Sequence, residues 1–456
     1  MAAPNILFLL VDCLRASAVF GDDRRTVTPT FDRLASEACC FSHLISVNSY
    51  TVPCMASIFT GLYPFAHGFR NQNPGKLPAE LPTLASVLNL HGYSTYAEVC
   101  GPVREEVGLA RGFQEFTWRD GGQSTLRNQW GEKLRQRLKT GGLKAPWFMY
   151  CHFWELHVPR QIAKRHRSER YGRDLYERAV SSFDPLLAEI LEAAGEDTIV
   201  VITGDHGEIG ESEAPGGRLG RLVRFRWLAD ALLPARWAKW GIQKATRIKN
   251  KLIFSKRGSK KIKGTVRRIL TTGHGIHVVE PLIRVPLIVS GATDLPSGRV
   301  LNRVVSQVDI APTLLDLAGL PDALPRCDGT SLLPLGHAGE MPARDVYFEN
   351  QGSNAGLSEA ERLESPWIAG LRSEQHKFWY RRFNPEKFPE LYDIVADPAE
   401  SRNLVDEMPE LAAEMRGKIE ALSPQDVDKP FSIAEAMSEE EAKVVTERLR
   451  DLGYVD

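Results

Sequence analysis

The chain has 456 residues, 43% of them hydrophobic and 25% charged, as is ordinary for a soluble globular protein. This length allows one large α/β domain and a smaller second one. The seven scattered cysteines have no metal-finger spacing, which favours the reduced thiols of a cytosolic protein over the disulfides of a secreted one. The apolar run at 6–11 is too short for a signal peptide, and no stretch reaches 18 uninterrupted apolar residues, so we expect a cytoplasmic protein.

Short apolar runs at 5–12, 146–154, 197–205 and 284–291 predict buried strands. Since strands buried on both faces read as continuous apolar runs, we predict that these strands run parallel. Helical segments such as 28–38 and 81–92 lie between them, and this alternation predicts a doubly wound α/β sheet. Ligands of such sheets lie beyond the carboxyl ends of the strands, which is where Asp12 and Asp205 stand.

Residues 217–268 interrupt this pattern with 17 basic residues and a single acidic one, Asp230. The remainder of the chain is correspondingly acidic, because the formal net charge of the whole is −1. Trp, Leu, Ile and Phe are interleaved with the charges, as in a basic amphipathic insertion. Either it is a solvated insertion without a specific partner, or it binds an anionic membrane surface or a polyanion. Specific recognition of nucleic acid is not expected.

The last quarter of the chain has a different pattern of polar and apolar residues. Residues 367–382 alternate like strands of an antiparallel sheet, and 389–404 is a turn-rich connection. Residues 408–422 and 438–456 read as amphipathic helices. We therefore predict a catalytic domain over 1–365, with the insertion at 217–268, and a small C-terminal domain over 366–456.

The dipeptide Asp205-His206 follows its predicted strand directly. A carboxylate and an imidazole in one cleft are a natural ligand pair for Mn²⁺ or Zn²⁺. An Asp-His dipeptide alone is weak evidence. Two strand-end aspartates together with the hydroxyl of Thr51, in the turn "SYTVPCM", make a stronger case for a metal site.

Blocks in consistent order along the chain carry a wider resemblance: "NILFLLVDCLRAS", "TVPCMASIFTGLYPFAHG", "HVP", "VVITGDHGE", "VVSQVDIAPTLLDLAGLP" and "LYDIVADPAESRNL". On these blocks the chain resembles the sulfatase family of the alkaline phosphatase superfamily. The resemblance implies a large, mixed, mostly parallel sheet flanked by helices, with a smaller C-terminal α/β domain that contains an antiparallel sheet.

The resemblance also implies roles for single residues. Asp12, Asp205 and His206 match the metal ligands of the family. Thr51 matches its nucleophile, which is a metal ligand as well. The positions of two histidines, His157 and His274, match residues that bind substrate or transfer protons. Candidate substrate-binding residues are Arg15, Asn71, Asn73, His277 and Arg284.

Four positions depart from the family pattern, one of them being His206, where calcium sulfatases commonly have Asn. Formylglycine is made from Cys or Ser, so Thr51 predicts a site without formylglycine. The Arg of the family signature is Met55, and the second residue of the usual Asp-Asp pair is Cys13, a further candidate ligand. We expect one or two divalent ions, with Mn or Zn favoured and Ca as the alternative.

A phosphothreonine can be resolved by a second acceptor, whereas an alkyl sulfate on Thr51 lacks the exit that a formylglycine adduct has. We therefore predict a hydrolase or transferase of phosphate mono- or diesters. The alternatives are a sulfuric ester hydrolase without formylglycine and an inactive, anion-binding homologue. The expected partners are an anionic phospho- or sulfo-ester substrate and, as a further possibility, a second copy of the chain. If the basic segment binds lipid, the protein is peripheral at the inner membrane surface.

Overall fold

The computed structural model describes residues 3–21, 23–72, 75–209, 274–275, 277–336, 342–351, 367–382, 385–386, 389–423 and 437–452. The basic segment at 217–268 and Asn73 lie outside the described residues. The seven cysteines are all free, and six of them are buried. No helix in the described ranges is long and apolar enough to cross a membrane.

Eight strands form one mixed sheet in the order β4-β3-β5-β1-β6-β7-β2-β8. Their bounds are β1 Asn5–Val11, β2 Cys39–Ile45, β3 Ser94–Val99, β4 Glu115–Trp118, β5 Trp147–Phe153, β6 Thr198–Thr203, β7 Arg284–Ser290 and β8 Arg299–Ser306. The central strand β1 pairs in parallel with β5 and β6. The predicted large, mostly parallel sheet is confirmed.

The predicted direction of the run at 284–291 is wrong. Strand β7 pairs antiparallel with β6 and with β2. Five of its seven residues are buried. Because burial on both faces gives a continuous apolar run whichever way a strand points, the sequence pattern could locate this strand without giving its direction.

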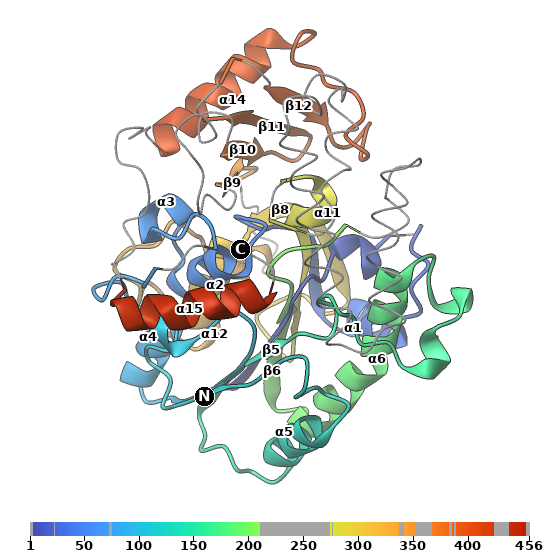
Figure 1. The fold of residues 1–456 in the computed structure, drawn as a ribbon, viewed down its shortest axis with the longest axis vertical. Helices are drawn as coiled ribbons and strands as arrows, with labels where there is room; N and C mark the ends of the chain where they lie inside the picture. Colours follow the sequence, from blue (N-terminus) through green and yellow to red (C-terminus); the bar gives the residue numbers. More distant parts are fainter. Residues whose placement is uncertain are drawn as a thin grey trace.

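Helices cover both faces of the sheet (Figure 1). One face carries α2 Thr51–Thr60, α4 Leu84–Leu90, α12 Ile310–Leu317 and α15 Glu439–Leu452, and the other carries α1 Pro29–Glu37, α5 Gln129–Lys139 and α6 Leu175–Ala194. Side chains of β1 alternate between the two cores, with Phe8 on the α2 side and Leu9 on the α6 side. Short helices are α3 Pro64–His67, α11 Glu280–Ile283 and the 3₁₀ turns Ala16–Ala18, Glu105–Val107, Lys164–His166, Glu169–Tyr171, Gln307–Asp309 and Leu333–Gly336.

A second, antiparallel sheet lies next to β8 and α11 at one end of the molecule (Figure 1). Its strands are β9 Val346–Asn350, β10 Ile368–Arg372, β11 His376–Arg381 and β12 Glu390–Asp393, and α14 Pro409–Leu422 packs on it. This confirms the expected antiparallel sheet of the C-terminal region. Strand β9 precedes the boundary predicted at residues 365 and 366, and that division of domains stays a prediction.

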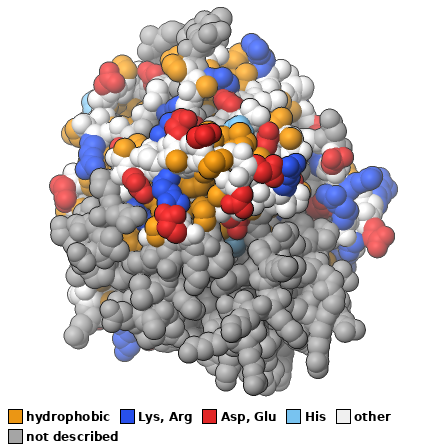
Figure 2. All heavy atoms as spheres, turned by 90° about the horizontal axis from the view of Figure 1, so that it is seen from above, with side chains coloured by type: hydrophobic (Ala, Val, Ile, Leu, Met, Phe, Trp, Pro, Cys, Tyr) orange, Lys and Arg blue, Asp and Glu red, His pale blue; other side chains and the backbone are white. Residues whose placement is uncertain are grey.

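Figure 2 looks onto the end of the molecule that carries α14 and the small sheet. Hydrophobic, acidic and basic side chains are mixed among the described residues of this face. Neither sign of charge dominates among the described residues of this face.

Candidate active site

Asp12 and Thr51 meet at the carboxyl edge of the main sheet. Asp12 directly follows β1, Thr51 is the first residue of α2, and both side chains are fully buried. The Oγ1 of Thr51 lies 3.5 Å from Oδ2 of Asp12. Since the amino end of a helix is electropositive, α2 favours negative charge at Thr51.

Asp205 and His206 complete the expected group from β6. Oδ1 of Asp205 accepts hydrogen bonds from the backbone N–H groups of Cys13 and of His206, at 3.2 and 2.8 Å. Nδ1 of His206 lies 2.9 Å from the Gly207 carbonyl and donates to it, so Nε2 carries the lone pair of the neutral ring. That Nε2 lies 3.4 Å from both Thr51 Oγ1 and Asp205 Oδ2.

His152 joins the same group, although the sequence suggested only a buried strand residue. It is fully buried on β5, and its Nε2 lies 3.3 Å from Asp12 Oδ2. Asp12, His152 and Asp205 bring one ligand atom each within 4.8 Å of one another. The pairing of β5 with β1 explains this contact. His152 lies opposite Leu10, two residues before Asp12, so its side chain reaches the Asp12 carboxylate.

The separations in this group fit a divalent ion. Ligand atoms bonded to one tetrahedral ion at about 2.0–2.1 Å lie roughly 3.3–3.4 Å apart, and the contacts above span 3.3 to 3.5 Å. Oδ2 of Asp205 is buried without a hydrogen-bond partner among the described residues. Because a buried carboxylate oxygen is costly unless it is paired, this atom fits the role of a ligand.

A second group borders the first. Nδ1 of His274 lies 3.3 Å from Oε2 of Glu208, and Sγ of Cys13 lies 3.8 Å from each of these two atoms. The thiol of Cys13 also donates to Oδ1 of Asp12 at 2.9 Å. Rings of His206 and His274 lie 4.2 Å apart, so the two groups adjoin. Glu208 was missed by the sequence reasoning, although it stands two residues after His206.

His157 lies beside these groups. Its ring stacks on Trp154 at 3.9 Å and lies 5.3 Å from the ring of His274. Nδ1 donates to the Val158 carbonyl at 2.8 Å, which leaves Nε2 as the acceptor of the neutral ring. Burial lowers the pKa of His157 to about 3. This histidine is therefore held as a neutral imidazole with a fixed tautomer.

Buried charges polarise the site strongly. Burial alone would raise the pKa of Asp12, but the hydrogen bond with His152 and the nearby histidines outweigh it and hold that pKa below its usual range. Burial also opposes ionisation of Glu208, yet His274 and Arg160 lower its pKa to about 2. Burial and the charge of Asp12 raise the pKa of Asp205. Three neighbouring carboxylates thus favour a bound cation.

The remaining predicted residues divide between the site and other places. Arg15 is buried, its guanidinium lies 4.4 Å from the ring centre of Tyr176, and its Cγ lies 2.9 Å from where a Cβ on Gly207 would stand. Asn71 donates to Gln351 at 2.8 Å, in the loop beside the start of α2. Their part in substrate binding stays a prediction.

His277 and Arg284 make contacts away from Thr51. The ring of His277 meets Trp379 of the small sheet at 5.6 Å, edge to face. Arg284 donates to Nε2 of His43 at 3.2 Å. Arg160, which the sequence reasoning did not single out, borders the second group. One of its guanidinium nitrogens lies 4.0 Å from Glu208 Oε2, and its side chain is 1% exposed.

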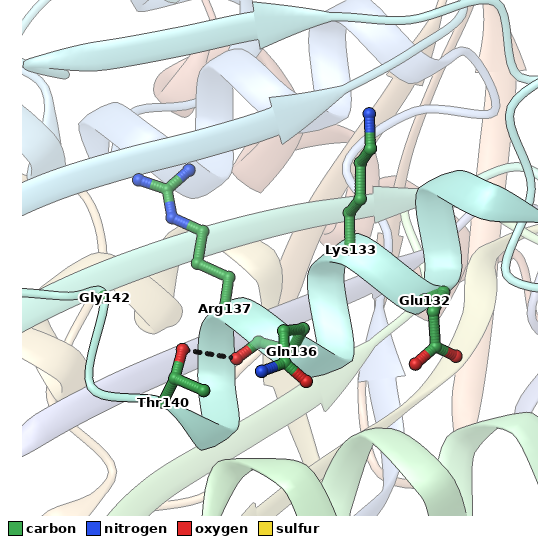
Figure 3. A pocket seen from close by; sticks show the side chains of 6 residues that line it. All are labelled: Glu132, Lys133, Gln136, Arg137, Thr140 and Gly142. Carbon is green, nitrogen blue, oxygen red and sulfur yellow. Dashed lines mark hydrogen bonds between the residues drawn. The ribbon is translucent and has the colours of Figure 1, made fainter.

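A shallow hollow on α5 lies elsewhere (Figure 3). Among the residues that line this hollow, the Thr140 hydroxyl donates to the Gln136 backbone carbonyl at 2.8 Å. The lining residues are Glu132, Lys133, Gln136, Arg137, Thr140 and Gly142. Residues of the two metal-ligand groups do not contribute to it.

Comparison with known proteins identifies the family. Residues 4–320 match the sulfatase family model, and residues 276–425 match the C-terminal model of N-sulphoglucosamine sulphohydrolase. The chain belongs to the sulfatase family. Among curated sulfatases it is similar to arylsulfatase K of Bos taurus, with 30% identity over 152 residues. That match covers 30% of this chain and 25% of the relative, so it spans about a quarter of the relative's length.

Solved structures share the fold of this sulfatase-family chain. The phosphonate monoester hydrolase of Agrobacterium radiobacter has a TM-score of 0.61 at 18% identity, over 95% of this chain and 100% of that one. A protein solved in complex with its substrate D-glucosamine-2-N,6-O-disulfate has a TM-score of 0.60 at 17% identity, over 94% and 99%. At such low identity these structures show a common fold and leave the substrate open.

Proposed function

We propose that this sulfatase-family protein is a metal-dependent hydrolase or transferase of phosphate mono- or diesters that uses Thr51 as its nucleophile. The observation that carries the proposal is the position of Thr51 Oγ1, which lies 3.5 Å from Asp12 and 3.4 Å from His206 at the start of α2. Asp12, His152, Asp205 and His206 are the residues that would hold the metal. A divalent ion bound there lowers the pKa of a neighbouring hydroxyl and offsets charge on phosphoryl oxygens.

The protein residues supply the remaining steps. Thr51 Oγ1 gives up its proton to solvent and attacks phosphorus, and the bond to the leaving oxygen breaks as the phosphothreonine forms. His274, which pairs with Glu208, is the candidate group that protonates the leaving oxygen, and the neutral ring of His157 is the candidate base. Water or an alcohol then gives up a proton to a histidine, attacks phosphorus and displaces Thr51, which regains its proton.

Thr51 favours phosphorus over sulfur chemistry. A sulfated formylglycine hydrate can expel sulfate by collapsing to the aldehyde, whereas a threonine side chain has no second hydroxyl for that collapse. A phosphothreonine is resolved by a second in-line attack at phosphorus. The fold shared with a phosphonate monoester hydrolase is compatible with this choice.

A sulfuric ester hydrolase is the second candidate, and the similarity to arylsulfatase K favours it. It would have to work without formylglycine, since Thr occupies position 51. An inactive, anion-binding homologue is disfavoured, because Asp12, Thr51, Asp205 and His206 are all present and in contact.

Rates with aryl phosphate, phosphodiester, phosphonate and aryl sulfate esters test the proposal. We expect turnover of a phosphorus ester, an at least about 10³-fold lower kcat for Thr51→Ala, and a phosphorylated Thr51 detectable by mass spectrometry in wild type. Thr60→Ala is the matched control, because Thr60 is also buried on α2 and its hydroxyl bonds only the backbone of its own helix end, at the Ala56 carbonyl and the Leu62 N–H. Full activity of Thr51→Ala, or turnover of sulfate esters alone, would refute the proposal.

The basic segment at 217–268 suggests a location. We propose that the protein is cytoplasmic and attaches peripherally to the anionic inner membrane surface through this segment, which contains 17 basic residues and one acidic residue. Binding of the full chain to vesicles containing phosphatidylserine should weaken steeply with added salt, and vesicles of phosphatidylcholine should not bind. Equal binding to both vesicles would contradict it.

A further inference from the structure

We propose that Cys13, Glu208 and His274 form a second metal site, which selects zinc or a similarly soft divalent ion and lies beside the carboxylate-rich group around Thr51. This proposal goes beyond the proposed function and does not depend on Thr51 being the nucleophile. Cys13 follows β1, Glu208 follows β6, and His274 precedes α11.

The separations of the three ligand atoms fit one ion. Around a tetrahedral zinc with Zn–S near 2.3 Å and Zn–N or Zn–O near 2.0–2.1 Å, ligand atoms lie roughly 3.3–3.6 Å apart. His274 Nδ1 and Glu208 Oε2 are 3.3 Å apart, and Cys13 Sγ lies 3.8 Å from both. A bound ion needs to draw the sulfur in only slightly. Three protein ligands leave a fourth position open, as in catalytic zinc sites.

The carboxylate of Glu208 is buried and only partly paired. Glu208 is 1% exposed, and its other oxygen, Oε1, has no hydrogen-bond partner among the described residues. The guanidinium of Arg160, at 4.0 Å from Oε2, is a distant ion pair. A carboxylate this deeply buried is stabilised by a cation at bonding distance far more than by a charge at 4.0 Å.

The backbone of Cys13 places its sulfur there. Cys13 has φ 66°, a left-handed conformation that costs a non-glycine residue on the order of 1 kcal/mol. Its Sγ lies between Oδ1 of Asp12, at 2.9 Å, and Oε2 of Glu208, at 3.8 Å. Asp12 turns its other oxygen, Oδ2, to Thr51 and His152. The Asp12 carboxylate therefore links two adjacent ligand groups.

The sulfur decides the choice of ion. Thiolate and imidazole ligands favour Zn²⁺ over Ca²⁺ or Mg²⁺, whereas the group around Thr51 is richer in oxygen and suits Mn²⁺ as well. With His274 engaged as a ligand, the leaving oxygen takes its proton from solvent. His157, whose Nε2 is the acceptor nitrogen of the neutral ring, is then the candidate base for the attacking water or alcohol.

Cobalt substitution of the full chain tests the second site. We expect two equivalents of Co²⁺ per chain and the near-ultraviolet charge-transfer band of a cobalt–thiolate bond. Cys13→Ala should bind one equivalent and lose the band. The matched control, Cys151→Ala, removes another fully buried thiol of the same sheet and should keep both equivalents and the band.

His274→Gln keeps the thiol and covers the case that Cys13→Ala fails to fold. It should weaken binding of the second equivalent at least about 10-fold and leave the first unchanged. A wild-type protein without the cobalt–thiolate band, or a Cys13→Ala protein that retains it, overturns the second site. One equivalent of metal with Thr51-dependent turnover removes the second site and leaves the proposed function standing. Two equivalents of metal without a phosphothreonine would support the second site and refute the proposed function.

Discussion

Met55 stands where the family signature has an arginine, and its side chain lies in the core. It is fully buried in the same cluster as Phe8 and Phe59. Its sulfur accepts a hydrogen bond from the hydroxyl of Tyr150 at 3.2 Å. The side chain therefore belongs to the packing beneath α2, whereas the buried guanidinium of Arg160 lies 4.0 Å from Glu208 Oε2.

Restoring the signature by Met55→Arg should destabilise the protein rather than improve catalysis. A guanidinium in this apolar cluster is unpaired, so we expect the free energy of unfolding to fall by about 3 kcal/mol or more. The control Met55→Leu keeps the volume and should cost less than about 1.5 kcal/mol. Urea denaturation of both variants measures the free energy of unfolding. An unchanged midpoint for Met55→Arg would contradict the prediction, because it would mean that the guanidinium finds polar partners or solvent.

His152 provides a second test at the residue scale. Because its Nε2 lies 3.3 Å from Asp12 Oδ2, His152→Gln should weaken binding of Mn²⁺ or Zn²⁺ by about 10- to 100-fold. His166→Gln is the control, since His166 is also buried and contacts Tyr171 instead. Competition with a chromophoric chelator gives both affinities. Equal affinities would assign His152 a structural role alone.

At the scale of elements, α2 is the piece that positions Thr51. All ten of its residues are buried, and it packs on the turn at Gln307–Asp309 and on α12. The helix ends at Gly61, which has φ 69° and closes the helix in a left-handed conformation. A Cβ at Gly61 would lie 2.5 Å from Cys327 Sγ, so this end is fixed by packing as well as by backbone conformation.

Gly61→Ala should therefore cost more than a glycine substitution made for conformation alone. We expect a loss of about 2–4 kcal/mol in the free energy of unfolding, from the left-handed backbone and the overlap with Cys327. Gly92 follows α4 with φ 90° and has nothing within 4 Å of the added atom, so Gly92→Ala should cost only about 1 kcal/mol. Chemical denaturation compares them, and equal losses would exclude a packing constraint on α2.

At the scale of the whole molecule, buried ion pairs join the small sheet to the main domain. Lys377 on β11 lies 2.9 Å from Glu400 and 3.4 Å from Glu280 at the start of α11. Arg372 on β10 lies 3.3 Å from Glu280 as well. Burial would raise the pKa of Glu280, but Lys377 and Arg372 outweigh it and lower that pKa to about 2.

Acid should loosen this junction. Because the pKa of Glu280 is lower in the folded state than its ordinary value of 4.5, its stabilisation is present above pH 4.5 and is lost as the pH falls towards 2. The loss amounts to about 3 kcal/mol. Glu280→Gln should have a lower free energy of unfolding than wild type at neutral pH. Between pH 5 and 3 that free energy should change less than it does in wild type. Glu407→Gln, at an exposed ion pair, should follow wild type.

The sequence predicted the buried strands and the two strand-end aspartates, whereas the stretch expected to be a turn at Thr51 is the first turn of α2. Both predictions follow from local information: continuous apolar runs mark buried strands, and the carboxyl ends of parallel strands share one edge of a sheet. Asp12 and Asp205 could therefore be placed together before their distance was known.

Tertiary structure alone decided the direction of β7, the place of Met55 in the core, and the grouping of His152, Glu208 and His274 with Cys13. Burial patterns are the same for both strand directions, so pairing had to fix β7. Cys13 and His274 stand 261 positions apart, and only the folded chain brings them to 3.8 Å. A contact across that separation leaves no local pattern, because packing of the whole sheet creates it.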